Sequence, residues 1–152
     1  MTDSITIEPA QERDLAAITA LIVELSNDVD GQDATDRQMI GTNVRALFHD
    51  PAARFLLARM ADAVVGFVNF TTRKTIIHPS ESGLVDELIV SREYRGKGIG
   101  RRLVSAVVDK CRELGCCELE VSTLMSNEKA RAFYKQCGFA EEAVLLEMDL
   151  LE

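Results

Sequence analysis

The sequence predicts an α/β (α+β) domain in which helices cover a mixed sheet. Two observations predict this class. Short stretches of alternating or continuous apolar residues recur along the chain, and such stretches are typical of strands. Longer stretches with apolar residues three or four positions apart are typical of amphipathic helices, and they separate several of the strands. Strands outnumber helices, which favours a sheet with a helical covering.

The elements can be placed in order from these patterns. Strands are expected at residues 5–9, 55–60, 64–72, 84–90 and 118–123, with one or two more from Phe139 onward. Helices are expected at residues 14–26, about 36–48, 101–114 and 128–136, with Asp14 as the cap of the first. A polar, acidic loop is expected over residues 27–36. The 55–60 and 64–72 strands are joined by a tight connection, which predicts a hairpin.

Composition limits the class of protein. A chain of 152 residues with 47% hydrophobic residues is expected to form one domain, residues 1–152, with its own core. Neither a membrane span nor a signal peptide is visible, so we expect a cytoplasmic protein without a membrane partner. The four cysteines lack the paired spacing of zinc ligands, so no metal is expected.

Charge is spread unevenly over the chain. The net charge is −8, yet residues 91–102 carry five basic residues against one acidic residue. Nucleic-acid binding requires broad positive coverage, so this balance argues against a nucleic-acid partner. A single basic patch instead suits one compact polyanion, such as a nucleotide-bearing cofactor. The acidic residues in the rest of the chain either attract a cationic acceptor or only keep the protein soluble.

A glycine-rich turn follows the 84–90 strand and precedes the 101–114 helix. Glycines let the backbone approach an anion, and the first amides of a helix lack partners within the helix. The turn therefore predicts a pyrophosphate site. The Walker spacing is absent, and glycines at 96, 98 and 100 do not match the dinucleotide fingerprint.

Two motifs resemble the signatures of the GNAT superfamily of N-acetyltransferases. The first is the acetyl-CoA signature at residues 94–100, preceded by Leu88-Ile89-Val90, and the second spans residues 127–139. The resemblance covers residues 4–150. It implies a mostly antiparallel sheet of about six or seven strands with a splay between the two middle strands, flanked by about four helices. Homodimers are common in this superfamily.

The resemblance also implies roles for residues near acetyl-CoA. Backbone groups of Leu88, Ile89 and Val90 are expected to pair with the pantetheine arm, and Asn127 to hydrogen-bond it. Tyr134 is expected to be the general acid, against the alternative of a packed aromatic residue. Side chains of Arg95, Lys97, Arg101 or Arg102 are expected to add positive charge. The pyrophosphate is expected on the amides of Arg95, Gly96, Lys97, Gly98, Ile99, Gly100 and Arg101.

The chemistry requires two further groups. A backbone N–H of Leu88 or Ile89 is our candidate to stabilise the charge that develops on the thioester oxygen. Asp86 and Glu87 are the candidate bases that take a proton from the amine. Strand alternation places only one of them on the acceptor side unless a bulge intervenes. Glu87 is preferred for its longer reach. The alternative is a carboxylate that only binds the acceptor or pairs with Arg73.

These features predict an acetyl-CoA-dependent N-acetyltransferase that works by direct attack in a ternary complex. The acceptor is expected to be a small primary amine: a polyamine, an aminoglycoside or an amino-acid derivative. A protein N-terminus or lysine is the second acceptor class. A rival hypothesis is a regulatory module that binds acyl-CoA without catalysis. The loop over residues 27–36 is expected to shape the choice of acceptor.

Overall fold

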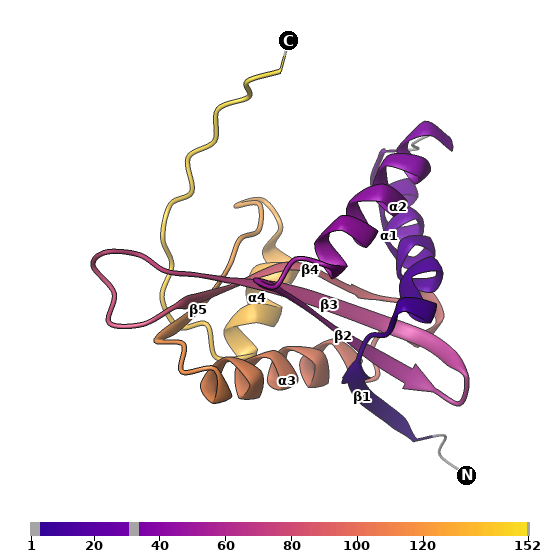
Figure 1. Ribbon diagram of the computed structural model, residues 1–152, viewed down its shortest axis with the longest axis horizontal. Coiled ribbons are helices and arrows are strands. Elements are labelled where there is room, and N and C mark those ends of the chain that lie inside the picture. The colour runs from indigo at the N-terminus through magenta and orange to yellow at the C-terminus, as the bar shows by residue number, and fades with distance from the viewer. Residues whose placement is uncertain (1–3, 31–33, 152) are drawn as a thin grey trace.

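The computed structural model describes residues 4–30 and 34–151, and its centre is a five-stranded sheet (Figure 1). The spatial order of the strands follows their order in the chain. The first four strands pair antiparallel, and the fifth pairs parallel to the fourth. The strands are β1 (Ile5–Pro9), β2 (Ala53–Met60), β3 (Ala63–Arg73), β4 (Ser82–Val90) and β5 (Glu118–Val121).

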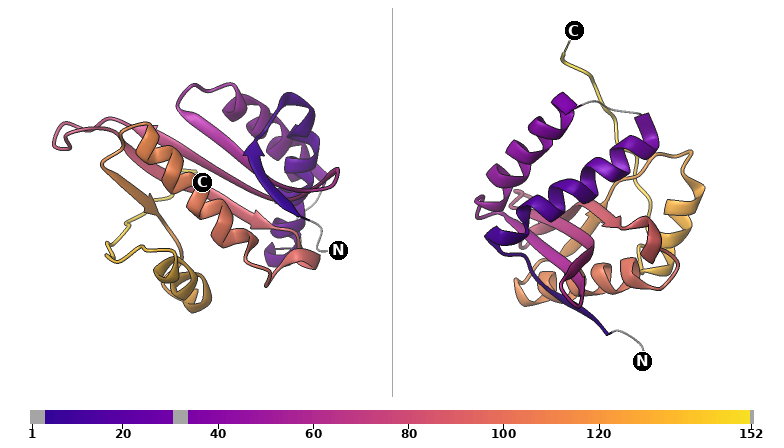
Figure 2. Two further views of the ribbon diagram at one scale, coloured as in Figure 1. Left: turned by 90° about the horizontal axis from the view of Figure 1, so that it is seen from below. Right: turned by 90° about the vertical axis from the view of Figure 1, so that its right-hand side faces the viewer.

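Helices cover both faces of this sheet (Figures 1 and 2). The paired helices α1 and α2 lie on one face, and α3 crosses the other face with α4 beside it. The helices are α1 (Leu15–Asp30), α2 (Ala34–Phe48), α3 (Ile99–Glu113) and α4 (Glu128–Gln136), with short 3-10 turns at η1 (Glu12–Asp14) and η2 (Arg92–Tyr94). Within the described ranges, no helix is long and apolar enough to cross a membrane.

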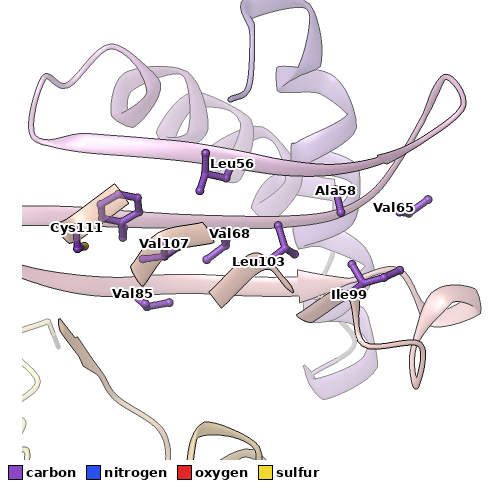
Figure 3. Packing of buried hydrophobic residues seen from close by; sticks show 10 residues of the cluster. Leu56, Ala58, Val65, Val68, Val85, Ile99, Leu103, Val107 and Cys111 are labelled. Carbon is purple, nitrogen blue, oxygen red and sulfur yellow. The ribbon is translucent and has the colours of Figure 1, made fainter. Parts of the chain in front are cut away.

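Two apolar clusters hold the layers together, one on each face of the sheet. Under α3, Ile99, Leu103 and Val107 recur at four-residue intervals and pack against buried residues of β2, β3 and β4 (Figure 3). Under α1 and α2, the cluster joins Ile18 and Phe67, among others, to Ile89 of β4. Burial of such apolar area is the main stabilising contribution to a fold of this kind. Strand β4 therefore contributes side chains to both clusters.

The predicted fold class is confirmed, with a different strand count. The predicted strands after Phe139 are absent from the described chain, where residues 140–151 have neither helix nor strand. The predicted 27–36 loop was too long, because α1 extends to Asp30 and α2 begins at Ala34; residues 31–33 lie outside the described residues. Asp14, the predicted cap of α1, is the last residue of the 3-10 turn η1 that precedes α1. Its carboxylate accepts the Gln11 N–H and pairs with Arg59 of β2.

The C-terminal segment, residues 140–151, leads away from the sheet as an extended tail (Figure 1). Apolar and acidic residues alternate from Leu146 to Leu150, which is the strand pattern that the sequence indicates. The structure leaves the apolar side chains of this tail in solvent, each at least 65% exposed. They are Val144, Leu145, Leu146, Met148, Leu150 and Leu151.

Candidate active site

A β-bulge interrupts β4 at the two predicted carboxylates. Asn69 of β3 lies opposite Glu87, but the next residue, Phe70, lies opposite Val85, so Asp86 is an extra residue in β4. A bulge of this kind shifts the alternation of side chains by one position. The bulge that the sequence analysis allowed for is therefore present, and it breaks the strict alternation that would place only one of the two carboxylates on the acceptor side. Val85 packs in the cluster under α3, whereas Ile89 packs in the cluster under α1 and α2.

The bulge brings both carboxylates to the same face of the sheet. Asp86 accepts a hydrogen bond from Thr71 Oγ1 at 3.1 Å, and the main-chain N–H of Glu87 donates to Asn69 Oδ1 at 3.0 Å. Thr71 and Asn69 are two residues apart on β3, on the same face as Phe67, which packs under α1 and α2. Asp86 and Glu87 thus lie together on the face that α1 and α2 cover.

Both carboxyl groups titrate above their ordinary range. Burial raises the pKa of Glu87, and the neighbouring Asp86 charge raises it further, while the Asn69 hydrogen bond opposes these effects. Burial also raises the pKa of Asp86, against the hydrogen bond from Thr71. Both residues stay accessible to solvent. A carboxylate with a raised pKa is a better proton acceptor near neutral pH than an ordinary one.

Beyond the bulge, β4 has one open side. Its pairing with β5 begins at Ser82 and ends where Val85 lies opposite Val121. Among the described residues, no strand pairs with residues 86–90 of β4 on this side. The splay implied by the family resemblance is present, and with five strands it lies next to the edge strand. An extended ligand can add to such an edge through main-chain hydrogen bonds.

Hydrogen bonds along β4 show which amides point into this open side. The N–H of Glu87 donates to Asn69 Oδ1 at 3.0 Å, and the N–H of Ser91 donates to the Val65 carbonyl at 2.9 Å. Both partners belong to β3. Because N–H groups alternate along a strand, Ile89 also points toward β3. Leu88 and Val90 point the other way, so Leu88 is the better of the two predicted oxyanion donors.

The glycine turn leads from the end of β4 into α3. Gly96 and Gly98 adopt positive φ angles of 76° and 80°, and a Cβ atom at either would meet no atom of the described residues within 4 Å, its chain neighbours aside. The first hydrogen bond of the helical ladder runs from the Arg102 N–H to the Gly98 carbonyl. The amides of Ile99, Gly100 and Arg101 therefore precede that ladder, and Gly98 offers no side chain to cap them. An open, glycine-lined helix start fits a bound pyrophosphate.

The basic side chains near the turn have separate partners. Arg95 Nε donates to the Val90 carbonyl at 3.0 Å, and the Lys97 ammonium lies 5.3 Å from the Tyr94 ring centroid. Arg101 donates to the Gln136 carbonyl at the end of α4. Arg102 donates to the Ile5 carbonyl of β1 at 2.8 Å. Arg95 and Lys97 therefore lie in the exposed turn itself, whereas Arg101 and Arg102 link α3 to other elements.

Helix α4 carries Asn127 and Tyr134 and packs against the start of α3. A Cβ atom at Gly100 would lie 3.4 Å from the Phe133 ring, in ordinary contact, so the two helices come close at this point. Asn127 is the N-cap of α4, because its Oδ1 accepts the Ala130 N–H at 3.0 Å. The Nδ2 group of Asn127 is then the side-chain donor that remains for a pantetheine oxygen.

Tyr134 is half-buried beside two aromatic rings. Its ring makes edge contacts with Phe133 and Phe139, at centroid distances of 5.1 and 5.6 Å. Burial raises the pKa of the Tyr134 hydroxyl, and Cys137 adds to the effect. The hydroxyl thus stays protonated at neutral pH, as a proton donor must. The aromatic contacts show that Tyr134 also has a packing role.

The structure adds one residue to the predicted site and removes one alternative. Asn69 contacts Glu87 and was not among the predicted residues. Its signal in the sequence is a lone polar side chain in the apolar strand over residues 64–70. The charge interactions of Arg73 are with Glu118 and Glu120 of β5, so Arg73 does not serve as the partner of Asp86 or Glu87.

Comparisons with known proteins identify the family. A model of the acetyltransferase (GNAT) family matches residues 15–139. The chain is 31% identical over 140 residues to the aminoglycoside N(6')-acetyltransferase type 1 of Stenotrophomonas maltophilia, and the alignment covers 90% of this chain and 86% of that protein. The chain therefore belongs to the GNAT family and is an N-acetyltransferase.

Solved structures share its fold. A Clostridium difficile 630 protein described as "a possible acetyltransferase" superposes with a TM-score of 0.86 at 21% identity, covering 97% of this chain and 99% of that one. AAC(6')-Iy, solved in complex with the bisubstrate analogue CoA-S-monomethyl-acetylneamine, superposes with a TM-score of 0.80 at 17% identity, covering 97% and 99%. At these identities the likeness concerns the fold.

Proposed function

We propose that the protein transfers the acetyl group of acetyl-CoA to the primary amine of a small molecule, by direct attack in a ternary complex. The proposal rests on the bulge in β4, which places two carboxylates at the point where β4 separates from β5. The glycine turn follows at the end of the same strand. A donor along the open side of β4 would therefore end beside two proton acceptors.

The donor is held mainly by main-chain groups. The C=O group of Leu88 and the N–H of Val90 pair with the pantetheine arm in place of a strand, which leaves the Leu88 N–H for the thioester oxygen. The amides at the start of α3 hold the pyrophosphate, and Gly96 and Gly98 leave the space that it needs. Arg95 and Lys97 supply positive charge in the exposed turn. Asn127 donates to the pantetheine from Nδ2.

The chemical step forms one bond and breaks one bond. The amine nitrogen attacks the thioester carbonyl carbon, and negative charge develops on the carbonyl oxygen. The Leu88 N–H stabilises this charge. When the C–S bond breaks, Tyr134 donates its hydroxyl proton to the departing sulfur. The nitrogen loses its second proton to solvent as the amide forms, and solvent returns a proton to Tyr134. The amide product and CoA thiol result, and no covalent enzyme intermediate is needed.

Glu87 is the proposed base, with Asp86 beside it. The amine must lose a proton to attack, since most amines are charged at neutral pH. Glu87 accepts that proton, directly or through a water molecule, because its raised pKa favours proton uptake. The Asp86 charge attracts the cationic amine and raises the proton affinity of Glu87. The pair thus binds the acceptor and activates it.

The acceptor is proposed to be a small cationic amine of the polyamine, aminoglycoside or amino-acid-derivative kind. Two acidic groups on one face favour a cation with more than one amine. The Stenotrophomonas maltophilia relative is named for an aminoglycoside acceptor. A protein N-terminus or lysine is the second class of acceptor. Paired carboxylates and a protonated tyrosine are groups that a non-catalytic acyl-CoA-binding module does not need.

A thiol-release assay tests this function. The purified chain is mixed with acetyl-CoA and, separately, with spermidine, an aminoglycoside, an amino-acid amide and a lysine-containing peptide. We expect CoA thiol release that depends on one of the small amines, with the acetylated amine identified by mass spectrometry. Release with the peptide alone would move the acceptor to the protein class. Tight acetyl-CoA binding without turnover on any amine would favour the regulatory module.

We also propose that the protein is a homodimer in which the tail over residues 140–151 contacts a second copy. Its apolar side chains are exposed within one chain, and such a surface is normally covered by a partner. The outer edge of β5 offers main-chain groups that an added strand can pair with. Light scattering of the purified chain measures the oligomeric state.

A further inference from the structure

Asn69 is unusual among the buried residues of the sheet. It is 1% exposed and lies between Val68 and Phe70, which are fully buried apolar residues. A buried amide destabilises the fold unless its polar atoms are hydrogen-bonded. The hydrogen bonds that it makes therefore indicate why a polar residue stands there.

The Asn69 side chain acts on the backbone and on the carboxyl group of Glu87. Oδ1 accepts the main-chain N–H of Glu87 at 3.0 Å, and the nearby side-chain amide lowers the pKa of the Glu87 carboxyl group. In a regular antiparallel pair, a main-chain carbonyl of β3 would accept that N–H. The bulge disturbs this pattern, and Asn69 supplies the missing acceptor. One amide thus holds the backbone of Glu87 and adjusts the proton affinity of its carboxyl group.

We propose that Asn69 is a positioning residue for acetyl transfer, which holds the bulge so that Glu87 faces the amine and the Leu88 N–H faces the thioester oxygen. The proposal rests on the function proposed above. Asn69 itself touches neither substrate, since it is buried and acts through Glu87. A strand without the bulge would place Asp86 and Glu87 on opposite faces.

Two substitutions separate the hydrogen bond to the Glu87 N–H from the effect of the Asn69 amide on the Glu87 carboxyl group. Asn69→Leu has a similar size and removes both, whereas Asn69→Asp keeps an oxygen to accept the Glu87 N–H and removes the amide donor. Hydrogen exchange followed by NMR reports the first bond. We expect the Glu87 amide to exchange at least tenfold faster in Asn69→Leu and to stay protected in Asn69→Asp. The Ser91 amide, bonded to the Val65 carbonyl, is the internal reference.

The pH profile reports the effect of Asn69 on the Glu87 carboxyl group. We expect both variants to lower kcat about tenfold or more with acetyl-CoA affinity changed less than about threefold. We also expect the acid limb of kcat to move to higher pH, because the Asn69 hydrogen bond holds the pKa of Glu87 down. Asn69→Asp should move it at least as far, since a second negative charge opposes ionisation of Glu87.

Ser82→Ala is the matched control. Ser82 lies at the far end of β4 from the glycine turn and is also buried, at 3% exposure. Its hydroxyl donates to Glu118 of β5. This variant should lose thermal stability and keep the wild-type pH profile. If the Asn69 variants change only stability, as Ser82→Ala does, the positioning role is wrong while the proposed function stands. If wild-type protein acetylates no amine, the proposed function fails, and the Glu87 exchange result alone decides whether Asn69 holds the bulge.

Discussion

At the scale of single residues, the proposed chemistry depends on a tyrosine hydroxyl, which we assign to Tyr134, one of the two tyrosines in the sequence. Tyr134→Phe keeps the ring contacts with Phe133 and Phe139 and removes the proton donor. We expect kcat to fall about 10²-fold, with little change in acetyl-CoA affinity. Steady-state kinetics and calorimetric titration measure the two quantities. Tyr94→Phe is the control, because its ring lies under Lys97 in the turn. Equal kcat in both variants would contradict the acid assignment.

Glu87 and Asp86 are predicted to respond differently to amide substitution. Wild-type kcat/KM should fall as the pH drops through the pKa of Glu87, which lies above the ordinary glutamate value. Glu87→Gln should lower kcat/KM about 10²-fold and abolish this acid limb. Asp86→Asn should keep the limb and move it to lower pH, because the Asp86 charge raises the pKa of Glu87. If the acid limb of the kcat/KM profile is lost in Asp86→Asn and kept in Glu87→Gln, Asp86 is the base instead of Glu87.

At the scale of elements, the start of α3 depends on a glycine with a left-handed backbone. Gly98→Ala places a Cβ on a residue with φ of 80°, which costs about 1–2 kcal/mol of stability. We expect a lower unfolding midpoint and weaker acetyl-CoA binding. Gly41→Ala in α2 is the control, because its Cβ would meet Thr19 at an ordinary 3.7 Å. That change should stabilise α2 by about 0.5–1 kcal/mol and leave binding unchanged. Unaltered acetyl-CoA binding in Gly98→Ala would contradict the pyrophosphate assignment.

The elements that sequence patterns predicted well are those with strong local signals. Helix α4 was placed correctly at residues 128–136, and β4 differed only at its start. The bulge was left open, because it depends on the register between β3 and β4, which no local pattern determines. The β5 strand ended earlier than predicted, and its separation from β4 is likewise a tertiary feature. Sequence patterns thus supplied candidate site residues but not the face of the sheet on which Asp86 and Glu87 lie.

At the scale of the whole molecule, the tail explains why the predicted last strands are missing. A strand needs a neighbour for its main-chain groups, and within one chain the described tail has none. The alternating apolar pattern that predicted a strand is still present from Leu146 to Leu150. The sheet of a single chain is therefore shorter than the family resemblance implied, and the homodimer proposal supplies the missing partner.

Removal of the tail tests this assembly. A chain ending at Glu142 should be monomeric by light scattering, where the full chain is a dimer. Leu146→Ser with Met148→Ser should weaken the dimer in the same direction, because it removes exposed apolar area. Glu147→Gln is the control on the same segment and should leave assembly unchanged. A full-length chain that stays monomeric at all concentrations would contradict the homodimer.

We propose above that acetyl-CoA adds to the open side of β4 beside the bulge. Amide hydrogen exchange with and without acetyl-CoA measures this pairing residue by residue. We expect new protection at Leu88 and Val90 and at the start of α3, over residues 99–101. The Ile89 and Ser91 amides, which face β3, should be protected already and change little. Protection that appears elsewhere, with Leu88 and Val90 unchanged at saturating acetyl-CoA, would contradict the account.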